Sequence, residues 1–260
     1  MTLIKTDAHG NDFLIVRSND VAPGTDLAAL ARAVCDRTTG VGADGLLIVE
    51  ETPAGARMQL RNADGSYSEV SGNGLRCIGA WLAQARDLAP GAELSVETDA
   101  GIKRLTLLAR SGARCTFRAF MGEPKDIRRF NLDVEGEVVD VATLSMGNPQ
   151  CVVLGPVTEE RLQHLGSRLA VHAWFPEGTN VELAERVGPS QLRILIWERG
   201  VGPTQSSGTG TCAAAVAAAC FGGAPRELDV DAPGGTQHVE WKDDGVWLTG
   251  WADVVNETAY

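Results

Sequence analysis

The chain lacks several features that would place it in a specialised class of protein. It contains no run of 18 apolar residues, so we expect no membrane-spanning helix. Residues 1–15 include His9, Asn11 and two acids, which does not fit a secretory signal peptide. With 44% hydrophobic and 22% charged residues, the composition is that of a globular protein and excludes a disordered or collagen-like chain.

Basic residues are also scarce, with 23 Lys and Arg against 34 Asp and Glu and a net charge of −11. A basic footprint for nucleic acid is therefore absent, and an anionic membrane would repel the chain. The six cysteines show neither CxxC nor CxH spacing, which is typical of free thiols in a reducing cytoplasm. We expect a cytoplasmic protein with no metal site, no nucleic-acid or membrane partner, and core positions for Cys35, Cys115, Cys151 and Cys220.

The most informative feature of the sequence is an internal repeat. Ser-Gly-Asn-Gly at 71–74 precedes an apolar run, and Ser-Gly-Thr-Gly at 207–210 precedes another, 136 residues later. Several further matches follow in the same order at nearly the same offset: 9–12 with 146–149, Asp44 with Asn180, Asn62 with Glu198, and helical patterns at 26–37 and 158–169. The pattern indicates a duplication in which each copy is long enough to form a domain.

Each copy follows one order of elements: strand, helix, strands, Gly-rich turn, apolar helix, then more strands. The helix after each Gly-rich turn is apolar on nearly every face, which predicts that it is buried. We predict an α+β fold of two pseudo-symmetric domains, each a mostly antiparallel β-barrel around a central helix. The expected domains are 1–118 and 119–250, and the spacing leaves open whether the tail, 251–260, returns to the first domain.

The two Gly-rich turns are candidate anion-binding sites. The first turn of a helix has unsatisfied N–H groups and the positive end of the helix dipole, which together attract a carboxylate. Ser71 and Ser207 are favoured capping residues, and capping alone would explain one such turn. Two related copies favour a ligand site as well, because pseudo-symmetric domains often place equivalent helix ends on one cleft. The candidate binding residues are Gly72, Asn73, Gly208 and Thr209.

The other repeated side chains suit a small zwitterion. Neutral amides can accept from an ammonium group or donate to a carboxylate. Arg199 can hold a carboxylate through two parallel hydrogen bonds, and Glu198 adds the opposite charge. The alternative is that each amide is a turn residue and that Glu198 and Arg199 form a solvated surface pair. The candidate binding amides are Asn11, Asn62, Asn148 and Asn180.

These motifs resemble the diaminopimelate epimerase family. The matching stretches run through nearly the whole chain, at 9–13, 40–45, 62–66, 72–77, 146–149, Asn180, 198–200 and 208–210. The resemblance implies two pseudo-symmetric α+β domains with an active site between them and no cofactor. It also implies an isomerase that interconverts L,L- and meso-diaminopimelate, a step toward lysine and peptidoglycan.

The chain departs from the family at the positions that carry the chemistry. In the family a cysteine precedes each Gly-rich turn, and one thiolate removes the α-proton while the other thiol returns one. Here those positions are Ser71 and Ser207, and the family's histidine after Gly-Asn-Pro is Gln150. A serine hydroxyl ionises several pH units above a thiol, so it needs a neighbouring base. Glu198 is the best candidate for that base, and His9 is a weaker one.

Four interpretations follow from this departure. The chain is a serine-based epimerase helped by Glu198, a related isomerase or dehydratase acting on another small acid, a silent zwitterion-binding homologue, or an engineered Cys-to-Ser trap. Gln150 counts against the trap, because such a design would leave the histidine in place. We adopt the first, with Ser71, Ser207 and Glu198 as the catalytic positions. The sequence leaves the oligomeric state open, a homodimer included.

Overall fold

The computed structural model describes all 260 residues, and the chain forms two compact units. Unit 1 contains residues 1–119 and 250–260, and unit 2 contains residues 120–249. Each unit combines strands with one central helix, which is the α+β barrel architecture that the sequence predicts.

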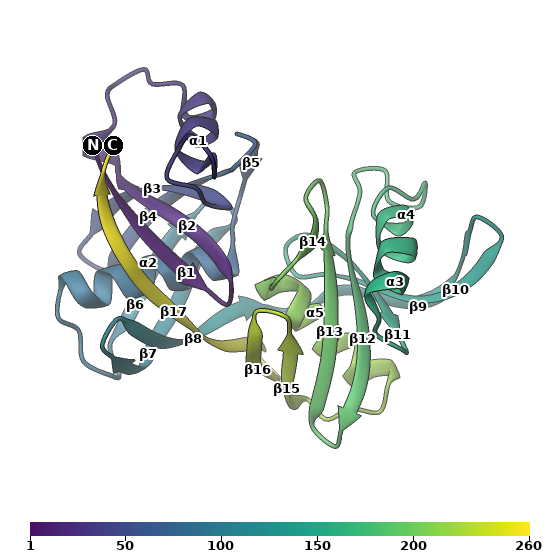
Figure 1. Cartoon of the computed structure of the whole chain (residues 1–260). Helices are drawn as coiled ribbons and strands as arrows, with labels where there is room; N and C mark the ends of the chain where they lie inside the picture. Colours follow the sequence, from purple (N-terminus) through teal and green to yellow (C-terminus); the bar gives the residue numbers. More distant parts are fainter. The chain divides into compact units, whose positions relative to one another are not determined.

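Two strands pass from one unit into the other. β8 (Arg114–Gly122) begins in unit 1, and β17 (Gly245–Ala259) returns the chain to it. The end of β17 lies beside the N-terminus of the chain, where the amino group of Met1 donates to the carbonyl oxygen of Tyr260 at 2.9 Å (Figure 1).

Unit 1 is a closed barrel of eight strands, in the order β17, β1, β2, β3, β4, β6, β7 and β8, with β8 pairing again with β17. The β2–β3 and β4–β6 pairs are parallel and the other described pairs antiparallel. Its elements are β1 (Thr2–Ala8), β2 (Asn11–Arg17), η1 (Ser18–Asp20), α1 (Leu27–Cys35), β3 (Gly45–Thr52), β4 (Gly55–Asn62), β5 (Tyr67–Ser68), α2 (Gly72–Ala85), β6 (Glu93–Thr98) and β7 (Gly101–Ser111).

Unit 2 repeats this order of pairing. β9, β10, β11, β12, β13, β15, β16 and β17 follow one another, and β11–β12 and β13–β15 are its parallel pairs. Its elements are β9 (Lys125–Val134), β10 (Glu137–Ser145), β11 (Pro149–Leu154), α3 (Glu159–Arg161), η2 (Leu162–Gly166), α4 (Ser167–Leu169), β12 (Asn180–Gly188), β13 (Gln191–Glu198), β14 (Gly202–Thr204), α5 (Gly208–Phe221), β15 (Glu227–Ala232) and β16 (Gly235–Lys242). Matching parallel pairs at matching places confirm the pseudo-symmetry that the repeat predicts.

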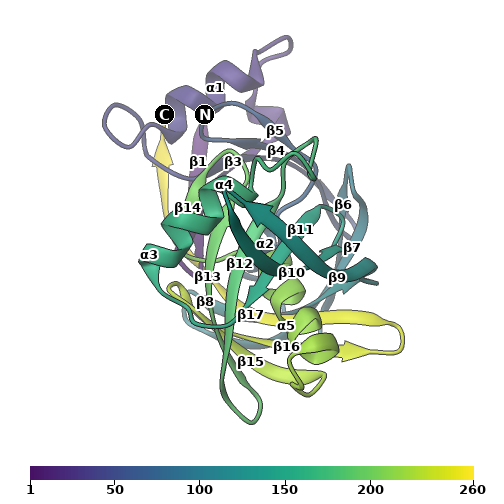
Figure 2. The ribbon, with the colours of Figure 1, turned by 90° about the vertical axis from the view of Figure 1, so that its right-hand side faces the viewer.

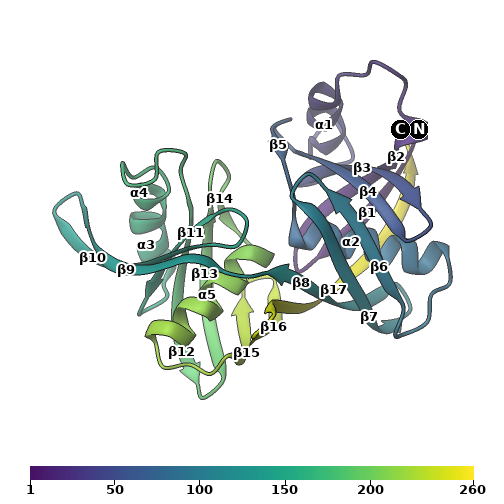
Figure 3. The same cartoon turned by 180° about the vertical axis from the view of Figure 1, so that it is seen from behind.

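The two central helices are buried because they are apolar on nearly every face. All residues 72–83 of α2 and 208–218 of α5 are buried. Strands of unit 1 lie on opposite sides of α2 (Figures 1 and 3), and α5 contacts β10, β11, β12, β13, β15 and β16 (Figure 2). Close packing needs small residues: a Cβ at Gly79 would lie 3.0 Å from the ring of Phe117.

The helical pattern at 158–169 differs from its counterpart at 26–37. α1 is a regular helix, and the Asp26 carboxylate accepts hydrogen bonds from the first-turn amides of Ala28 and Ala29. The second segment has a wider π-type turn between α3 and α4. At the end of that turn Gly166 lies against Trp197, since a Cβ there would be 2.9 Å from the Trp197 Cβ.

All six cysteines are free and five are buried, among them Cys35, Cys115 and Cys151 as expected. The core placement predicted for Cys220 is wrong, because it lies in the last turn of α5 and is exposed. No helix is both long and apolar enough to cross a membrane. The structure contains no group of three His, Cys, Asp or Glu side chains that could hold a metal ion.

Candidate active site

Ser71 and Ser207 cap the two central helices with nearly the same geometry. Their backbones are extended, with φ and ψ of −133° and 125° at Ser71 and −142° and 127° at Ser207. The Oγ of Ser71 accepts a hydrogen bond from the Gly74 amide at 3.1 Å, and the Oγ of Ser207 accepts one from Gly210 at 3.3 Å. Both serines are therefore held at the first turn of a buried helix.

The first amides of each capped turn precede the hydrogen bonds of its helix. The first amides that donate to a carbonyl four residues back are those of Leu75 and Thr211. Residues 72–73 and 208–209 therefore precede the hydrogen-bonded part of each helix. Neither first turn contains an acidic side chain, so the positive end of each helix dipole is not neutralised from within the helix. Each unit thus presents the elements of a carboxylate site.

An equivalent side-chain bridge ties each capped turn to the neighbouring hairpin. In unit 1 the side-chain amide of Asn73 donates to the Asn11 Oδ1 at 3.1 Å. In unit 2 the side-chain amide of Asn148 donates to the Thr209 Oγ1 at 3.4 Å. The partners occupy matching places of the repeat, so the duplication extends to side-chain contacts at the predicted binding residues.

Unit 1 contains an ionic network that the sequence analysis missed. Asn11 donates to Asp44 at 2.8 Å, and Arg37 bonds both Asp44 and Asp12. Burial would raise the pKa of Asp12, but hydrogen bonds from Arg37 and Lys5 outweigh burial and lower that pKa. The network joins the glycine-rich loop at 40–45 to the hairpin that carries Asn11. The sequence signal for this network was an acid in each of two motifs, Asp12 in 9–12 and Asp44 in 40–45.

Asn62 is engaged in its own turn. Its backbone amide donates to the Ser66 carbonyl and its side-chain amide to the Ser66 Oγ, both at 2.9 Å. The turn lies beside the glycine-rich loop, because Ala63 donates to the Asp44 carbonyl at 2.9 Å. These contacts account for Asn62 as a turn residue, and its contact with a ligand stays a prediction.

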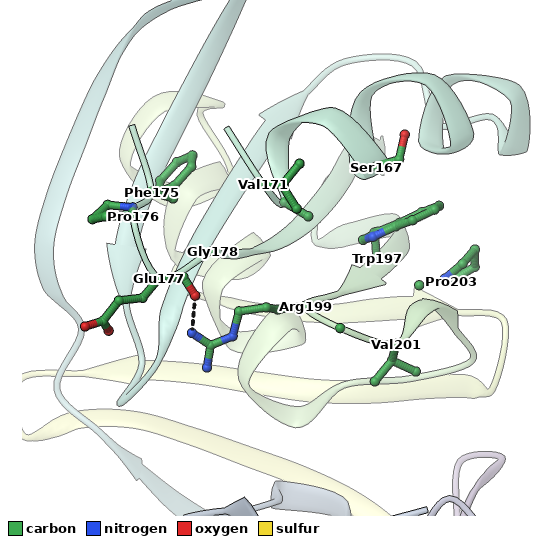
Figure 4. Close-up of a pocket in the computed structure, with 13 residues that line it drawn as sticks. Ser167, Val171, Phe175, Pro176, Glu177, Gly178, Trp197, Arg199, Val201 and Pro203 are labelled. Atoms are coloured by element: carbon green, nitrogen blue, oxygen red, sulfur yellow. Dashed lines mark hydrogen bonds between the residues drawn. The ribbon is translucent and has the colours of Figure 1, made fainter. Parts of the chain in front are cut away.

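Asn180 and Arg199 meet at the ends of two neighbouring strands of unit 2. The Arg199 amide donates to the Asn180 Oδ1 at 2.9 Å, and its guanidinium donates to the Glu177 carbonyl at 2.8 Å. Arg199 also lines a cavity of about 690 Å³, whose other walls include Trp197, Phe175 and Val171 (Figure 4). The structure therefore places the predicted arginine at an open, partly apolar pocket.

The remaining candidates have distinct surroundings. Gln150, at the position of the family's histidine, is buried and donates to the Asn148 Oδ1 at 2.6 Å. Glu198 ends β13, is half-buried and pairs with Gly202. The His9 Nε2 accepts from the Trp251 amide at 3.1 Å, and His9 has a positive φ of 56°. His9 thus fits the turn interpretation better than the role of a base.

The caps give a first test of the structure. Ser207→Ala removes the acceptor of the Gly210 amide and should lower the free energy of unfolding by about 1 kcal/mol. Ser207→Gly should cost only a few tenths of a kcal/mol, because glycine is tolerated at this position. Urea denaturation of the two variants measures the difference. A Ser207→Ala variant as stable as the unmodified chain would show that the hydroxyl does not cap the helix.

Solved structures share this fold along the whole chain. The structure of a probable proline racemase from Agrobacterium radiobacter K84 superposes with a TM-score of 0.77 at 15% identity, covering 100% of this chain and 92% of that one. At this identity the likeness shows the fold alone. The paired barrels with capped central helices therefore define the class, which is that of the two-domain racemase and epimerase fold.

Sequence similarity identifies the family within that class. The family model for diaminopimelate epimerase matches residues 3–127 and 142–255. The diaminopimelate epimerase of Desulforudis audaxviator is 42% identical, over 98% of this chain and 97% of the relative. That of Moorella thermoacetica is 38% identical, over 96% of this chain and 95% of the relative. The chain belongs to the diaminopimelate epimerase family and is an isomerase.

Proposed function

We propose that the chain interconverts L,L- and meso-diaminopimelate without a cofactor. The observation that carries this proposal is the pair of equivalent serine-capped helix N-termini, one in each unit, with no acid in either first turn. Its supports are the family membership and the full-length relatives that are named for this activity. The small zwitterionic substrate is the ligand class for which these donors are suited.

The proposed reaction draws one proton-transfer group from each unit. One of Ser71 and Ser207 removes the α-proton as the C–H bond breaks, and the other supplies a proton to the opposite face of the carbon. The electron pair left on carbon is delocalised into the substrate carboxylate, whose charge the first-turn amides stabilise. Glu198 is the proposed base that activates a serine hydroxyl.

The other candidates hold the ends of the substrate in this proposal. Arg199 and Asn180 receive a carboxylate, and Glu198 attracts an ammonium group. The amides at the two hairpins and at the turn of unit 1 supply the remaining hydrogen bonds. Those amides are Asn11, Asn62, Asn73 and Asn148, and the backbone donors are those near Gly72, Gly208 and Thr209.

We also propose that the protein works in the cytoplasm. Six free cysteines in one chain suit a reducing compartment. A homodimer, which the sequence leaves open, is tested by sedimentation against the 27.5 kDa mass of one chain.

Substrate binding is the direct test of the proposal. At a concentration about a hundred times its dissociation constant, diaminopimelate should stabilise the protein by about 2.7 kcal/mol, seen as a rise in melting temperature. Arg199→Ala should abolish this rise, while Arg128→Ala, an exposed arginine of β9, should leave it unchanged.

Three results would change the proposal. An unchanged rise in Arg199→Ala would show that Arg199 is only a surface residue. No rise with any amino acid would mean a different class of ligand. A rise without turnover would support the silent zwitterion-binding homologue instead.

A further inference from the structure

Glu182 is a buried acid that the proposed reaction does not use. It lies in β12, its side chain is 0% exposed, and neither carboxyl oxygen has a hydrogen-bond partner in the structure. Burying a carboxyl group without such partners is unfavourable, so its presence needs an explanation beyond packing.

The Glu182 carboxyl faces the first turn of α5. A Cβ at Gly210 would lie 2.6 Å from the Glu182 Oε1 and 3.3 Å from the Ser207 Cβ, so both side chains border the same point. Gly210 is also the residue whose amide Ser207 caps. The buried acid therefore lies directly against the turn that presents Gly208 and Thr209 as anion donors.

Unit 1 shows that packing does not require an acid here. A Cβ at Gly74, the counterpart of Gly210, would lie 3.3 Å from the Leu47 Cδ2 and 3.3 Å from the Ser71 Cβ. A leucine thus fills the equivalent space in the other copy of the same fold. The carboxyl group of Glu182 is an asymmetry between the two turns, and it affects only the turn of unit 2.

The surroundings favour the neutral form of this acid. Burial raises the pKa of Glu182 well above its usual range, and the negative charge of Glu198 on β13 raises it further. On β11 the nearby titratable group is Cys151, a buried thiol whose own pKa is raised. α5 contributes no charged side chain. A neutral carboxyl leaves the positive end of α5 available, whereas a carboxylate there would repel a bound anion.

We propose that Glu182 is a positioning residue for the carboxylate site at α5: its protonated form leaves the first turn open to the ligand's carboxylate, and its ionised form weakens that binding. The inference rests on the proposed function, because it needs a carboxylate ligand at this turn. The inference adds one requirement to that function, namely that Glu182 stays protonated while the ligand is bound.

The test compares diaminopimelate binding by calorimetry in wild type, Glu182→Gln and Glu185→Gln, from neutral to alkaline pH. Glutamine is a neutral isostere of the protonated acid, so Glu182→Gln should bind normally at neutral pH. Above the pKa of Glu182 the wild type should lose affinity relative to that variant, by at most about tenfold per pH unit. Glu185, which pairs with Arg193 at the surface, is the control and should follow the wild type. Comparing variants cancels titration of the ligand's own amino groups.

Two outcomes would overturn the inference while binding itself persists. One is the same pH dependence in wild type and Glu182→Gln, and the other is loss of binding in Glu182→Gln at neutral pH. Absence of binding in every version would instead overturn the proposed function together with the inference.

Ligand-free stability tests the same proton separately. Because the folded pKa is raised, the stabilisation from protonated Glu182 is complete below the unfolded pKa and is lost as pH rises through the folded one. Wild type should therefore lose stability relative to Glu182→Gln as pH increases. Glu182→Leu copies the leucine that fills this space in unit 1 and should fold. The wild type should lose stability relative to this variant too as pH increases. A stability difference that does not change with pH would contradict the protonated state.

Discussion

The Ser71→Cys, Ser207→Cys double variant is expected to epimerise diaminopimelate orders of magnitude faster than the unmodified chain. A thiol has a pKa of about 8.5, and a helix N-terminus lowers it further toward neutral pH. A serine hydroxyl ionises several units higher, and each unit corresponds to about 1.36 kcal/mol. Both serines lie at helix N-termini as capping residues, so a sulfur at either place would lie at the positive end of a helix dipole.

The single variants and a matched control sharpen this experiment. Because the proposed reaction needs a group on each face, either single cysteine should gain less than the pair. Ser111→Cys with Ser190→Cys, one exposed serine from each unit, should leave the rate unchanged. Gln150→His belongs in a triple variant, since the missing histidine limits the gain.

Two results would contradict the reasoning in different ways. If every cysteine version binds diaminopimelate but stays inactive on it, the reacting substrate is another small acid. If the unmodified chain already matches a thiol enzyme, the argument from hydroxyl ionisation fails. In that case Glu198 or another group is the true base.

Gly40→Ala is expected to lower the free energy of unfolding by about 3 kcal/mol or more. The loop after α1 folds back on the helix end, where Val41 donates to the Val34 carbonyl and Ala43 to that of Cys35. A Cβ at Gly40 would lie 2.2 Å from the carbonyl oxygen of Ala33. Since that atom belongs to the backbone of α1, it cannot rotate away as a side chain could.

The expected effect is a fall in melting temperature of about 6–12 °C. Gly24→Ala is the matched control: its φ of +81° disfavours alanine, but no other atom lies within 4 Å of its Cβ position. At Gly24 we expect the free energy of unfolding to fall by about 1–2 kcal/mol, from the backbone conformation alone. Gly40 does not have a positive φ, so a loss at Gly40 no larger than that at Gly24 would contradict the effect expected from the contact with α1.

The architecture was predictable because its signals are local and repeated. A serine before Gly-x-Gly and an apolar run defines a capped, buried helix within one segment of sequence, and two copies imply a duplication. The parallel pairing of β2 with β3 depends on contacts between segments about 30 residues apart, as between Phe13 and Gly45. No local pattern encodes such a pairing.

The site was predictable only in part, for the same reason. Ser71 and Ser207 are fixed by their own turns, but the bond between Asn11 and Asn73 joins residues 62 positions apart. Glu182 lies between Val181 and Leu183, where alternation along a strand suggests an exposed side chain. Only the position of α5 in the barrel shows that this side chain is buried.

Exchange of the α-proton in deuterated water tests the central claim most directly. The unmodified chain, incubated with L,L-diaminopimelate and followed by NMR, should place deuterium at the α-carbon and form the meso isomer, at a rate that rises with pH as a serine or its partner ionises. Binding of diaminopimelate with no exchange, even at high protein concentration and alkaline pH, would contradict the claim that this chain is an epimerase of that substrate.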